Sequence, residues 1–206
     1  MTEDGLSEVS PRRLNARQVS VVEDLVDAAE IEAAERGYEG LTVRNVAKRA
    51  GVAPATAYTY FSSKDHVLAE LLWRRVRYVP EATFSPSMVV AERLETTVSD
   101  LGAIAGGSPE VVAACTQALL STSPDVRGLR LKIGTEFHRR LSRAAEGEIN
   151  ANVVTILVTT YFGALLSAGM GHMDFAEVPG FVAEAARLMS SGDMAATGRP
   201  ISAVLG

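Results

Sequence analysis

Apolar residues recur along the chain with a period close to that of an α-helix. In the first such segment, which begins near Val19, the apolar positions with this spacing are Val22, Leu25, Val26, Ala29 and Ala33. Gly37 follows directly after Arg36, and a glycine at that place favours the left-handed conformation that ends many helices. The pattern therefore predicts a first helix from about residue 19 to residue 36.

Three shorter helices are predicted after this one. Thr42 is a typical N-cap, and the residues that follow it place an apolar face at Val43, Val46, Ala47 and Ala50. Gly51 ends that helix, and Pro54 lies in the first turn of the next one, where a missing amide hydrogen is tolerated. The expected bounds of the first two are 43–50 and 52–61, and the third starts at Ser62 or Ser63 and ends at about Tyr78. One face of this third helix carries Val67, Leu68, Leu71, Leu72 and Val76.

Two prolines in residues 80–86 indicate a boundary between these helices and the rest of the chain. Beyond it the same periodicity predicts five further helices, at roughly 88–105, 109–121, 124–145, 149–170 and 175–190. No strand pattern, repeat or low-complexity tract competes with this assignment, so we expect an all-α fold. Its expected parts are an arm over 1–18, a first domain over 19–79 and a larger helical bundle over 80–206.

Charge is distributed unevenly between these parts. The whole chain has a formal net charge of -5, which by itself disfavours binding to nucleic acid. Residues 41–77, however, hold seven basic and two acidic residues, a local net charge of +5. The arm adds Arg12, Arg13 and Arg17, which either reach a DNA minor groove or have no role.

Composition places the chain among globular proteins and gives an expected location. Its 206 residues are 47% hydrophobic and 22% charged. The single cysteine, Cys115, cannot form an internal disulfide, and no signal peptide is recognisable, so we expect a cytoplasmic protein. Residues 153–173 contain no charged side chain and approach the length of a membrane span, but we interpret them as a helix buried on all sides, in a core or at a subunit interface.

The most informative stretch is residues 42–64, TVRNVAKRAGVAPATAYTYFSSK. In a helix-turn-helix the first helix packs on the second through small residues and a tight turn, and Ala47 and Gly51 stand where close approach is expected. Tyr58 and Tyr60 are two residues apart, about 200° around a helix, so both cannot point into a core. Ala57 and Phe61 share a face and are the better core candidates, which leaves Tyr58 or Tyr60 to offer a hydroxyl to phosphate.

Lys64 supports the same interpretation. It lies in the first turn of a predicted helix, where the helix dipole disfavours a cation unless an anion is near. A DNA phosphate would supply that anion. The stretch therefore predicts a DNA-binding helix-turn-helix.

This stretch resembles the DNA-binding region of the TetR family of transcriptional regulators, and the resemblance extends over residues 22–72. The matching elements are Thr42-Val43-Arg44, Val46-Ala47, Ala50-Gly51-Val52, Thr56, Tyr58, Tyr60-Phe61 and Ser63-Lys64. The resemblance implies an N-terminal three-helix helix-turn-helix domain followed by a helical bundle that binds ligand and dimerises. The DNA-binding residues that it implies, together with Ala55 on the face expected toward the bases, are Thr42, Arg44, Ala55, Thr56, Tyr58, Thr59, Tyr60 and Lys64.

Some positions depart from the family pattern. Ala53 stands where a capping serine or threonine is common, Ala57 where a larger aliphatic residue is common, and Glu30 and Ala33 where apolar bulk is usual. The face expected toward the bases is poor in hydrogen-bonding groups: Ala53, Pro54, Ala55, Thr56 and Thr59. We therefore expect specificity to depend on thymine methyl contacts, on Arg44 and on DNA shape.

In the larger domain, the resemblance implies an effector site between helices and dimerisation through the last two long helices. Small residues in the first of these would allow two backbones to approach closely, at Gly163, Ser167, Ala168 and Gly171. The last helix carries an apolar stripe suited to a helix-helix contact: Phe181, Val182, Ala185, Leu188 and Met189. The alternative is that both helices belong to the core of one subunit.

For the effector site only apolar positions on the middle helices can be nominated. They are Leu94, Val98, Leu101, Val112, Cys115, Leu119, Phe137, Leu141 and Tyr161, and most of them are expected to be core. Their lack of charge suggests a lipophilic effector. On an apolar face Cys115 is better interpreted as a small buried hydrophobic residue than as a redox sensor.

The predicted function is that of a homodimeric repressor that a small effector releases from a palindromic operator. In the DNA-binding dimer the two recognition helices lie about one DNA turn apart, near 34 Å, and effector binding favours a dimer geometry without this separation. The alternatives are a regulator without ligand and a helix-turn-helix adaptor for other proteins. An enzyme is disfavoured because His66, His138 and His172 lack metal-ligand spacing and no phosphate loop or nucleophile motif is present. We expect no cofactor, no metal and no membrane partner.

Overall fold

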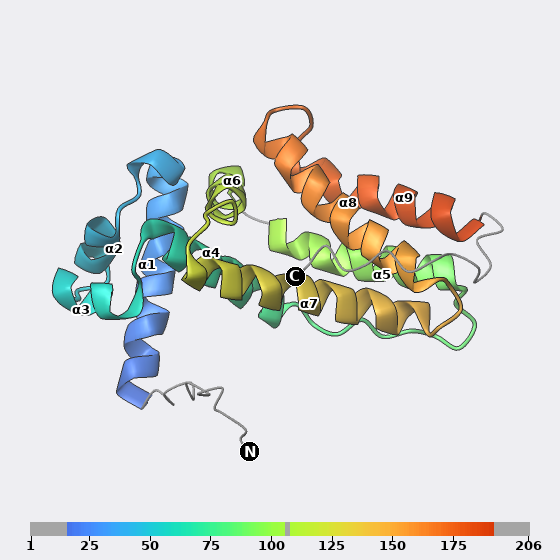
Figure 1. The fold of residues 1–206 in the computed structure, drawn as a ribbon, viewed down its shortest axis with the longest axis horizontal. Helices are drawn as coiled ribbons and strands as arrows, with labels where there is room; N and C mark the ends of the chain where they lie inside the picture. The colour runs from blue at the N-terminus through green and yellow to red at the C-terminus, as the bar shows by residue number, and fades with distance from the viewer. Residues whose placement is uncertain (1–15, 106–107, 192–206) are drawn as a thin grey trace, which may run out of the picture.

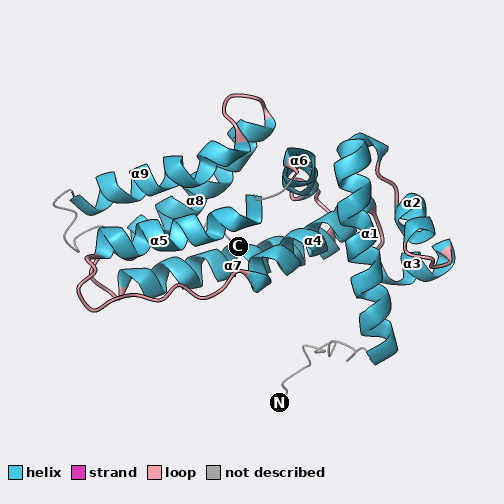
Figure 2. Cartoon of the chain, turned by 180° about the vertical axis from the view of Figure 1, so that it is seen from behind, coloured by secondary structure: helices cyan, strands magenta, loops and turns pink. Residues whose placement is uncertain are grey.

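The computed structural model describes residues 16–105 and 108–191, and within them it contains helices and no strand (Figures 1 and 2). The prediction of an all-α fold is confirmed. The helices are α1 (Ala16–Gly40), α2 (Val43–Arg49), α3 (Pro54–Tyr60), α4 (Lys64–Tyr78), α5 (Val90–Gly102), α6 (Pro109–Ala118), α7 (Pro124–Ala145), α8 (Ala151–Gly169) and α9 (Val178–Ser191), with short 3-10 turns at Ala103–Ala105 and Phe175–Glu177.

The first four helices form one packed unit. The apolar face of α1 is buried against α4 and α6, with Leu25 and Ala29 fully inaccessible on α1 and Leu68 and Leu71 on α4. Gly37 has a φ of 62° and interrupts α1 where the sequence predicted a stop, although one further turn continues to Gly40. Figure 1 shows α2 and α3 side by side, with α2 packed on α1, at the end of the molecule farthest from α9.

The start of α1 differs from the expected arm. The helix begins at Ala16, so Arg17 lies in the helix and is exposed. Arg12 and Arg13 lie outside the described residues.

The remaining helices form a bundle in which α5 packs on α9 and α7, while α8 packs on α7 and α9. The contact between α5 and α9 is close at Gly102, where a β-carbon would stand 2.6 Å from the Pro179 ring. Glycine is therefore required at that crossing. The helix α6 packs on both α1 and α4 and so joins the bundle to the first unit.

Arg140 of α7 fixes the segment between the two parts. Its buried guanidinium donates hydrogen bonds to the carbonyl oxygens of Val79 (2.8 Å) and Pro80 (3.0 Å), and its Nε donates to Glu136 at 2.7 Å. Hydrogen bonds to Arg139 and Arg140 outweigh burial and hold the pKa of Glu136 down at about 2. The predicted boundary at the first proline is thus a rigid connection and not a free linker.

The apolar helix α8 is the one described helix with the length and composition of a membrane span, with a mean hydropathy of 1.6. Its inner face, which includes Val153, Leu157 and Tyr161, is buried against the bundle. Its outer face is open in the single chain, where Gly163 is exposed. Burial on all sides is therefore absent within one chain, and an interface helix would leave such a face.

Candidate nucleic-acid interface

The turn between α2 and α3 is built from local hydrogen bonds. Thr42 caps α2, because its Oγ1 accepts a hydrogen bond of 3.1 Å from the Asn45 amide. The Val52 amide donates to the Ala47 carbonyl at 2.9 Å, and Gly51 adopts a left-handed φ of 66°. A β-carbon on Gly51 would meet no atom within 4 Å, so glycine is needed there for backbone conformation and not for the close approach that we expected.

The predicted inner and outer faces of α3 are confirmed. Ala57 and Phe61 are buried, Tyr58 is 49% exposed and Tyr60 is half-buried. Ala53 makes no side-chain cap, as its position predicted. The helix therefore presents a row of small and hydroxyl-bearing residues to solvent: Ala55, Thr56, Tyr58 and Thr59.

The helix α2 is fixed on α1 by ion pairs. Arg49 Nε donates to Glu32 at 2.7 Å and its guanidinium also bonds Glu35, while Arg36 lies 2.8 Å from the other oxygen of the buried Glu32 carboxylate. These contacts neutralise Arg49. Its charge therefore serves the packing of α2 and not the surface toward DNA.

Lys64 is also engaged within the protein. Its ammonium donates to the Tyr38 carbonyl at 2.8 Å and lies 3.8 Å from the centre of the Tyr38 ring. Burial, together with the hydrogen bond that its hydroxyl donates to Asp65, raises the pKa of Tyr38 to about 12. Because Tyr38 stabilises the Lys64 ammonium, this cation no longer needs a phosphate to offset the helix dipole at the start of α4. A phosphate contact by Lys64 stays a prediction.

The ion pairs change the interpretation of the local net charge. Arg74 and Arg75 of α4 both pair with Glu30 of α1, at 3.1 and 2.6 Å. This explains why an acidic residue stands where the family pattern has apolar bulk. Among the described residues between 41 and 77, the exposed cations without a carboxylate partner are Arg44, Lys48 and Arg77.

Lys48 is absent from the predicted set of DNA-binding residues. It lies one turn after Arg44 on the exposed face of α2. The spacing of four residues between two basic side chains was the signal that could have identified it.

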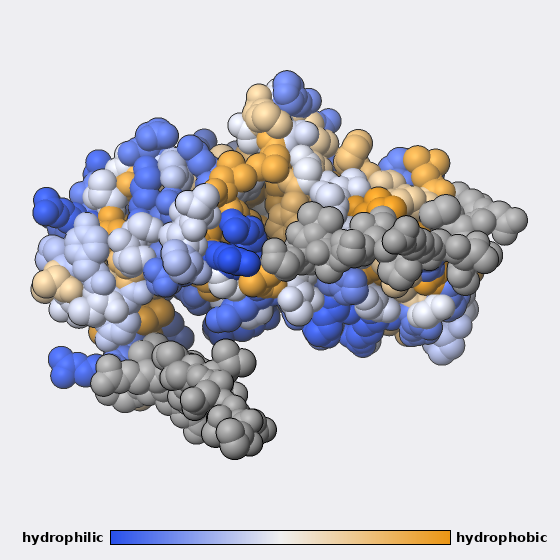
Figure 3. All heavy atoms as spheres, in the orientation of Figure 1, coloured by the Kyte–Doolittle hydropathy of each residue, from blue (hydrophilic) through white to orange (hydrophobic). Residues whose placement is uncertain are grey.

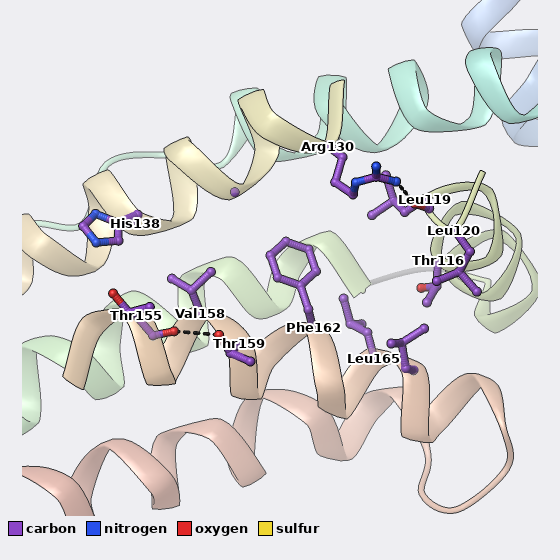
Figure 4. Close-up of a pocket in the computed structure, with 12 residues that line it drawn as sticks. Thr116, Leu119, Leu120, Arg130, His138, Thr155, Val158, Thr159, Phe162 and Leu165 are labelled. Atoms are coloured by element: carbon purple, nitrogen blue, oxygen red, sulfur yellow. Dashed lines mark hydrogen bonds between the residues drawn. The ribbon is translucent and has the colours of Figure 1, made fainter. Parts of the chain in front are cut away.

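Most nominated effector residues form packed core. A cavity of about 250 Å³ lies between α6, α7 and α8 (Figure 4), and Leu119 is the nominated residue that lines it. The other eight are buried elsewhere in the core: Leu94, Val98, Leu101, Val112, Cys115, Phe137, Leu141 and Tyr161. Burial raises the pKa of the Cys115 thiol to about 12, which agrees with the interpretation of this cysteine as a buried hydrophobic residue.

Sequence reasoning did not identify the other cavity residues, most of which lie on α7 and α8. The residues that line the cavity besides Leu119 are Thr116, Leu120, Arg130, Gly134, His138, Thr155, Val158, Thr159, Phe162, Leu165 and Leu166. Figure 3 shows hydrophobic residues gathered over the bundle, whereas the end formed by α2 and α3 is mostly hydrophilic. The two candidate sites therefore differ in chemistry as well as in place.

The last helix divides its predicted apolar stripe between two faces. Val182 is fully buried against its own subunit, whereas Phe181 and Leu188 are 54% and 64% exposed. On α8 the small residue Gly163 is exposed but Ala168 is buried. An apolar outer face remains on α9 after the bundle has formed.

Comparisons with known proteins agree with this geometry. Residues 25–71 match the family described as bacterial regulatory proteins, tetR family. Over 166 residues the chain is 41% identical to an HTH-type transcriptional regulator of Mycobacterium tuberculosis, covering 80% of this chain and 78% of that protein. Over 150 residues it is 27% identical to the HTH-type transcriptional repressor KstR of the same organism, covering 69% and 68%. A TetR transcriptional regulator from Rhodococcus sp. RHA1 has a similar fold, with a TM-score of 0.70, 22% identity and coverage of 84% and 97%.

The chain belongs to the TetR family of transcriptional regulators. Members of this family are DNA-binding regulators and not enzymes, act as dimers and bind small-molecule effectors. No group of His, Cys, Asp and Glu among the described residues is placed to hold a metal ion.

Proposed function

We propose that this protein is a cytoplasmic repressor that binds a palindromic operator as a homodimer and leaves it when a small lipophilic effector binds. The observation that carries the DNA-binding part is the division of α3 into two faces. Ala57 and Phe61 anchor the helix, while Thr56, Tyr58 and Thr59 stand outward from a rigid scaffold. Such a helix can enter a major groove without losing its packing.

The proposed roles follow from exposure and chemistry. Thr56 and Thr59 contact base edges and thymine methyl groups together with Ala55, and Arg44 reads a base or binds phosphate at the start of α2. The hydroxyls of Tyr58 and Tyr60 donate hydrogen bonds to DNA phosphates, and Thr42 and Lys64 contact the sugar-phosphate backbone of the DNA. Lys48 adds a cation beside Arg44. Thr59 Oγ1 already donates a hydrogen bond to the Thr56 carbonyl at 2.6 Å, so toward DNA this hydroxyl can act only as a hydrogen-bond acceptor.

The repressor role is supported by the name of the KstR relatives, which are transcriptional repressors. The lipophilic effector is supported by the cavity between α6, α7 and α8, because apolar side chains contribute to its lining, among them Val158, Phe162 and Leu165 of α8. The homodimer is supported by Phe181 and Leu188 on the outer face of α9. We accordingly assign 19–79 to DNA binding and 80–206 to effector binding and dimerisation.

A footprint and a salt series test this function together. The full-length protein is incubated with DNA from upstream of its own gene, and its affinity is measured by fluorescence anisotropy at several salt concentrations. We expect a protected palindrome and a linear fall of log affinity with log salt. A protein-interaction adaptor would give neither a footprint nor a steep slope, and that result would refute the proposal.

A further inference from the structure

We propose that the ligand of the cavity is an amphipathic acid, whose apolar body fills the space along α8 and whose anionic head group binds Arg130. This inference rests on the proposed function for the location of the effector. It adds the charge of the ligand and the residue that recognises it.

The first observation is the pairing of buried and half-buried cations. Among the described residues, five lysines and arginines of this kind have a carboxylate within 4.0 Å: Lys64, Arg74, Arg75, Arg93 and Arg140. Arg130 is half-buried and has no such partner. A guanidinium stays charged at every physiological pH, so a partly desolvated one without a counter-ion favours an incoming anion.

The second observation is the set of hydrogen bonds that Arg130 makes. Its Nη1 donates to the carbonyl oxygens of Leu119 (2.6 Å) and Ser121 (3.1 Å), which holds the side chain against the end of α6. A guanidinium has five N–H donors, so Nε and Nη2 keep donors for a ligand. Two neighbouring donors of this kind suit a carboxylate, which accepts two hydrogen bonds in one plane.

The third observation is the chemistry of the remaining lining. It contains no Asp or Glu, and its threonine hydroxyls are already used as donors: Thr116 Oγ1 bonds the Val112 carbonyl at 2.8 Å, Thr159 Oγ1 bonds the Thr155 carbonyl at 2.9 Å and Thr155 Oγ1 bonds the Ala151 carbonyl at 3.3 Å. These hydroxyls offer acceptors and so do not compete for an anion.

Figure 4 shows how the polar groups are arranged along the cavity. Arg130 lies at the end near α6, whereas His138 and Thr155 lie at the other end, with Val158 and Phe162 of α8 between them. A ligand with one charged end and one apolar chain matches this order. The volume of about 250 Å³ is just below the range of roughly 300–1,000 Å³ common for ligand sites, so a short chain is the suitable probe.

The test compares octanoate with 1-octanol, which have the same chain and differ in charge. Binding to the full-length protein is measured by isothermal titration calorimetry without DNA at pH 7.5. We expect octanoate to bind at least about tenfold more tightly than 1-octanol. Arg130→Met should abolish this preference, and Arg130→Lys should keep part of it. Arg127→Met, an exposed position three residues earlier on α7, should leave it unchanged.

Four results would overturn the inference. Two concern the wild-type protein: no binding of either probe, or equal affinity for both. The other two concern variants: an equal loss of affinity for both probes in Arg130→Met, or a preference for octanoate that is lost in His138→Gln but kept in Arg130→Met. The equal loss would show a structural role of Arg130 on the end of α6. Because operator binding is measured separately and without ligand, its failure would refute the proposed function and would be distinguishable from these results.

Discussion

The hydroxyl of Ser62 donates a hydrogen bond of 2.7 Å to a carboxylate oxygen of Asp125. Ser62 lies two residues after the end of α3, and Asp125 lies in the first turn of α7. His66 Nδ1 is 3.7 Å from the same carboxylate oxygen. The end of the proposed recognition helix is thus attached to the helix that carries Arg130.

A double-mutant cycle measures this attachment. Ser62→Ala and Asp125→Ala each remove one side of the hydrogen bond, and the free energy of unfolding should show a coupling of about 0.5–1 kcal/mol between them. Asp125 is 49% exposed, so a larger value is not expected. Glu95→Ala, an exposed carboxylate on α5, combined with Ser62→Ala is the control and should be additive. Additivity of the Ser62 and Asp125 changes would show that the bond does not form in solution.

His66 should make stability depend on pH. Burial lowers its pKa from 6.5, although Asp125 and Glu70 raise it, and the ring also packs edge-on against Phe61. A histidine with a lowered folded-state pKa binds more protons when unfolded, so its stabilising contribution is complete above pH 6.5 and is lost as the pH falls below that value. The melting temperature should therefore fall between pH 7.5 and 5.5, and this fall should be smaller in His66→Gln. The exposed His172→Gln is the control; an unchanged pH profile in His66→Gln would contradict the prediction.

Arg140 should matter far more for stability than its neighbour Arg139. Arg140→Met leaves the buried carbonyl of Val79 and the part-buried carbonyl of Pro80 without this donor, and we expect a loss of about 3 kcal/mol in the free energy of unfolding in urea. Arg139 makes its ion pairs with Glu81 and Glu136 at the surface, so Arg139→Met should cost less than about 1 kcal/mol. Equal losses would mean that the bonds to the connecting segment contribute little.

Substitutions in the interface should separate phosphate contacts from base contacts. Tyr60→Phe and Lys64→Ala should weaken binding to all DNA sequences alike, whereas Thr56→Ala and Arg44→Ala should change preference at defined operator positions by about 1–3 kcal/mol per base pair. A selection of randomised operators followed by sequencing measures base preference, and fluorescence anisotropy measures the uniform loss of affinity. A changed base preference in Tyr60→Phe would move Tyr60 out of the phosphate group.

The outer face of α9 should carry the dimer. Phe181→Glu together with Leu188→Glu places two charges on that face without touching the buried Val182, and sedimentation velocity should then show monomers. Leu131→Glu, which is 38% exposed on α7, is the matched control and should remain dimeric. An intact dimer in the α9 variant would place the interface elsewhere.

Local signals explain why the helix-turn-helix was predictable. The N-cap Thr42, the left-handed Gly51 and the helical spacing of Ala57 and Phe61 lie within 23 residues, and each acts through its own backbone or nearest turn. The bounds of the later helices followed from the same periodicity, with the short 3-10 turns at their ends as the main difference.

The charges and the cavity depended on tertiary contacts. Glu30, Glu32 and Tyr38 of α1 engage cations from α2 and α4 that are close in space but distant in the chain, so the local net charge overstated what faces DNA. Periodicity identified inward faces on α5 to α8 but could not show which inward residues meet a neighbour and which meet empty space, because that depends on how the helices cross. Only the arrangement of α6, α7 and α8 around the cavity selected Leu119 among the nine nominated positions and placed Arg130 beside it.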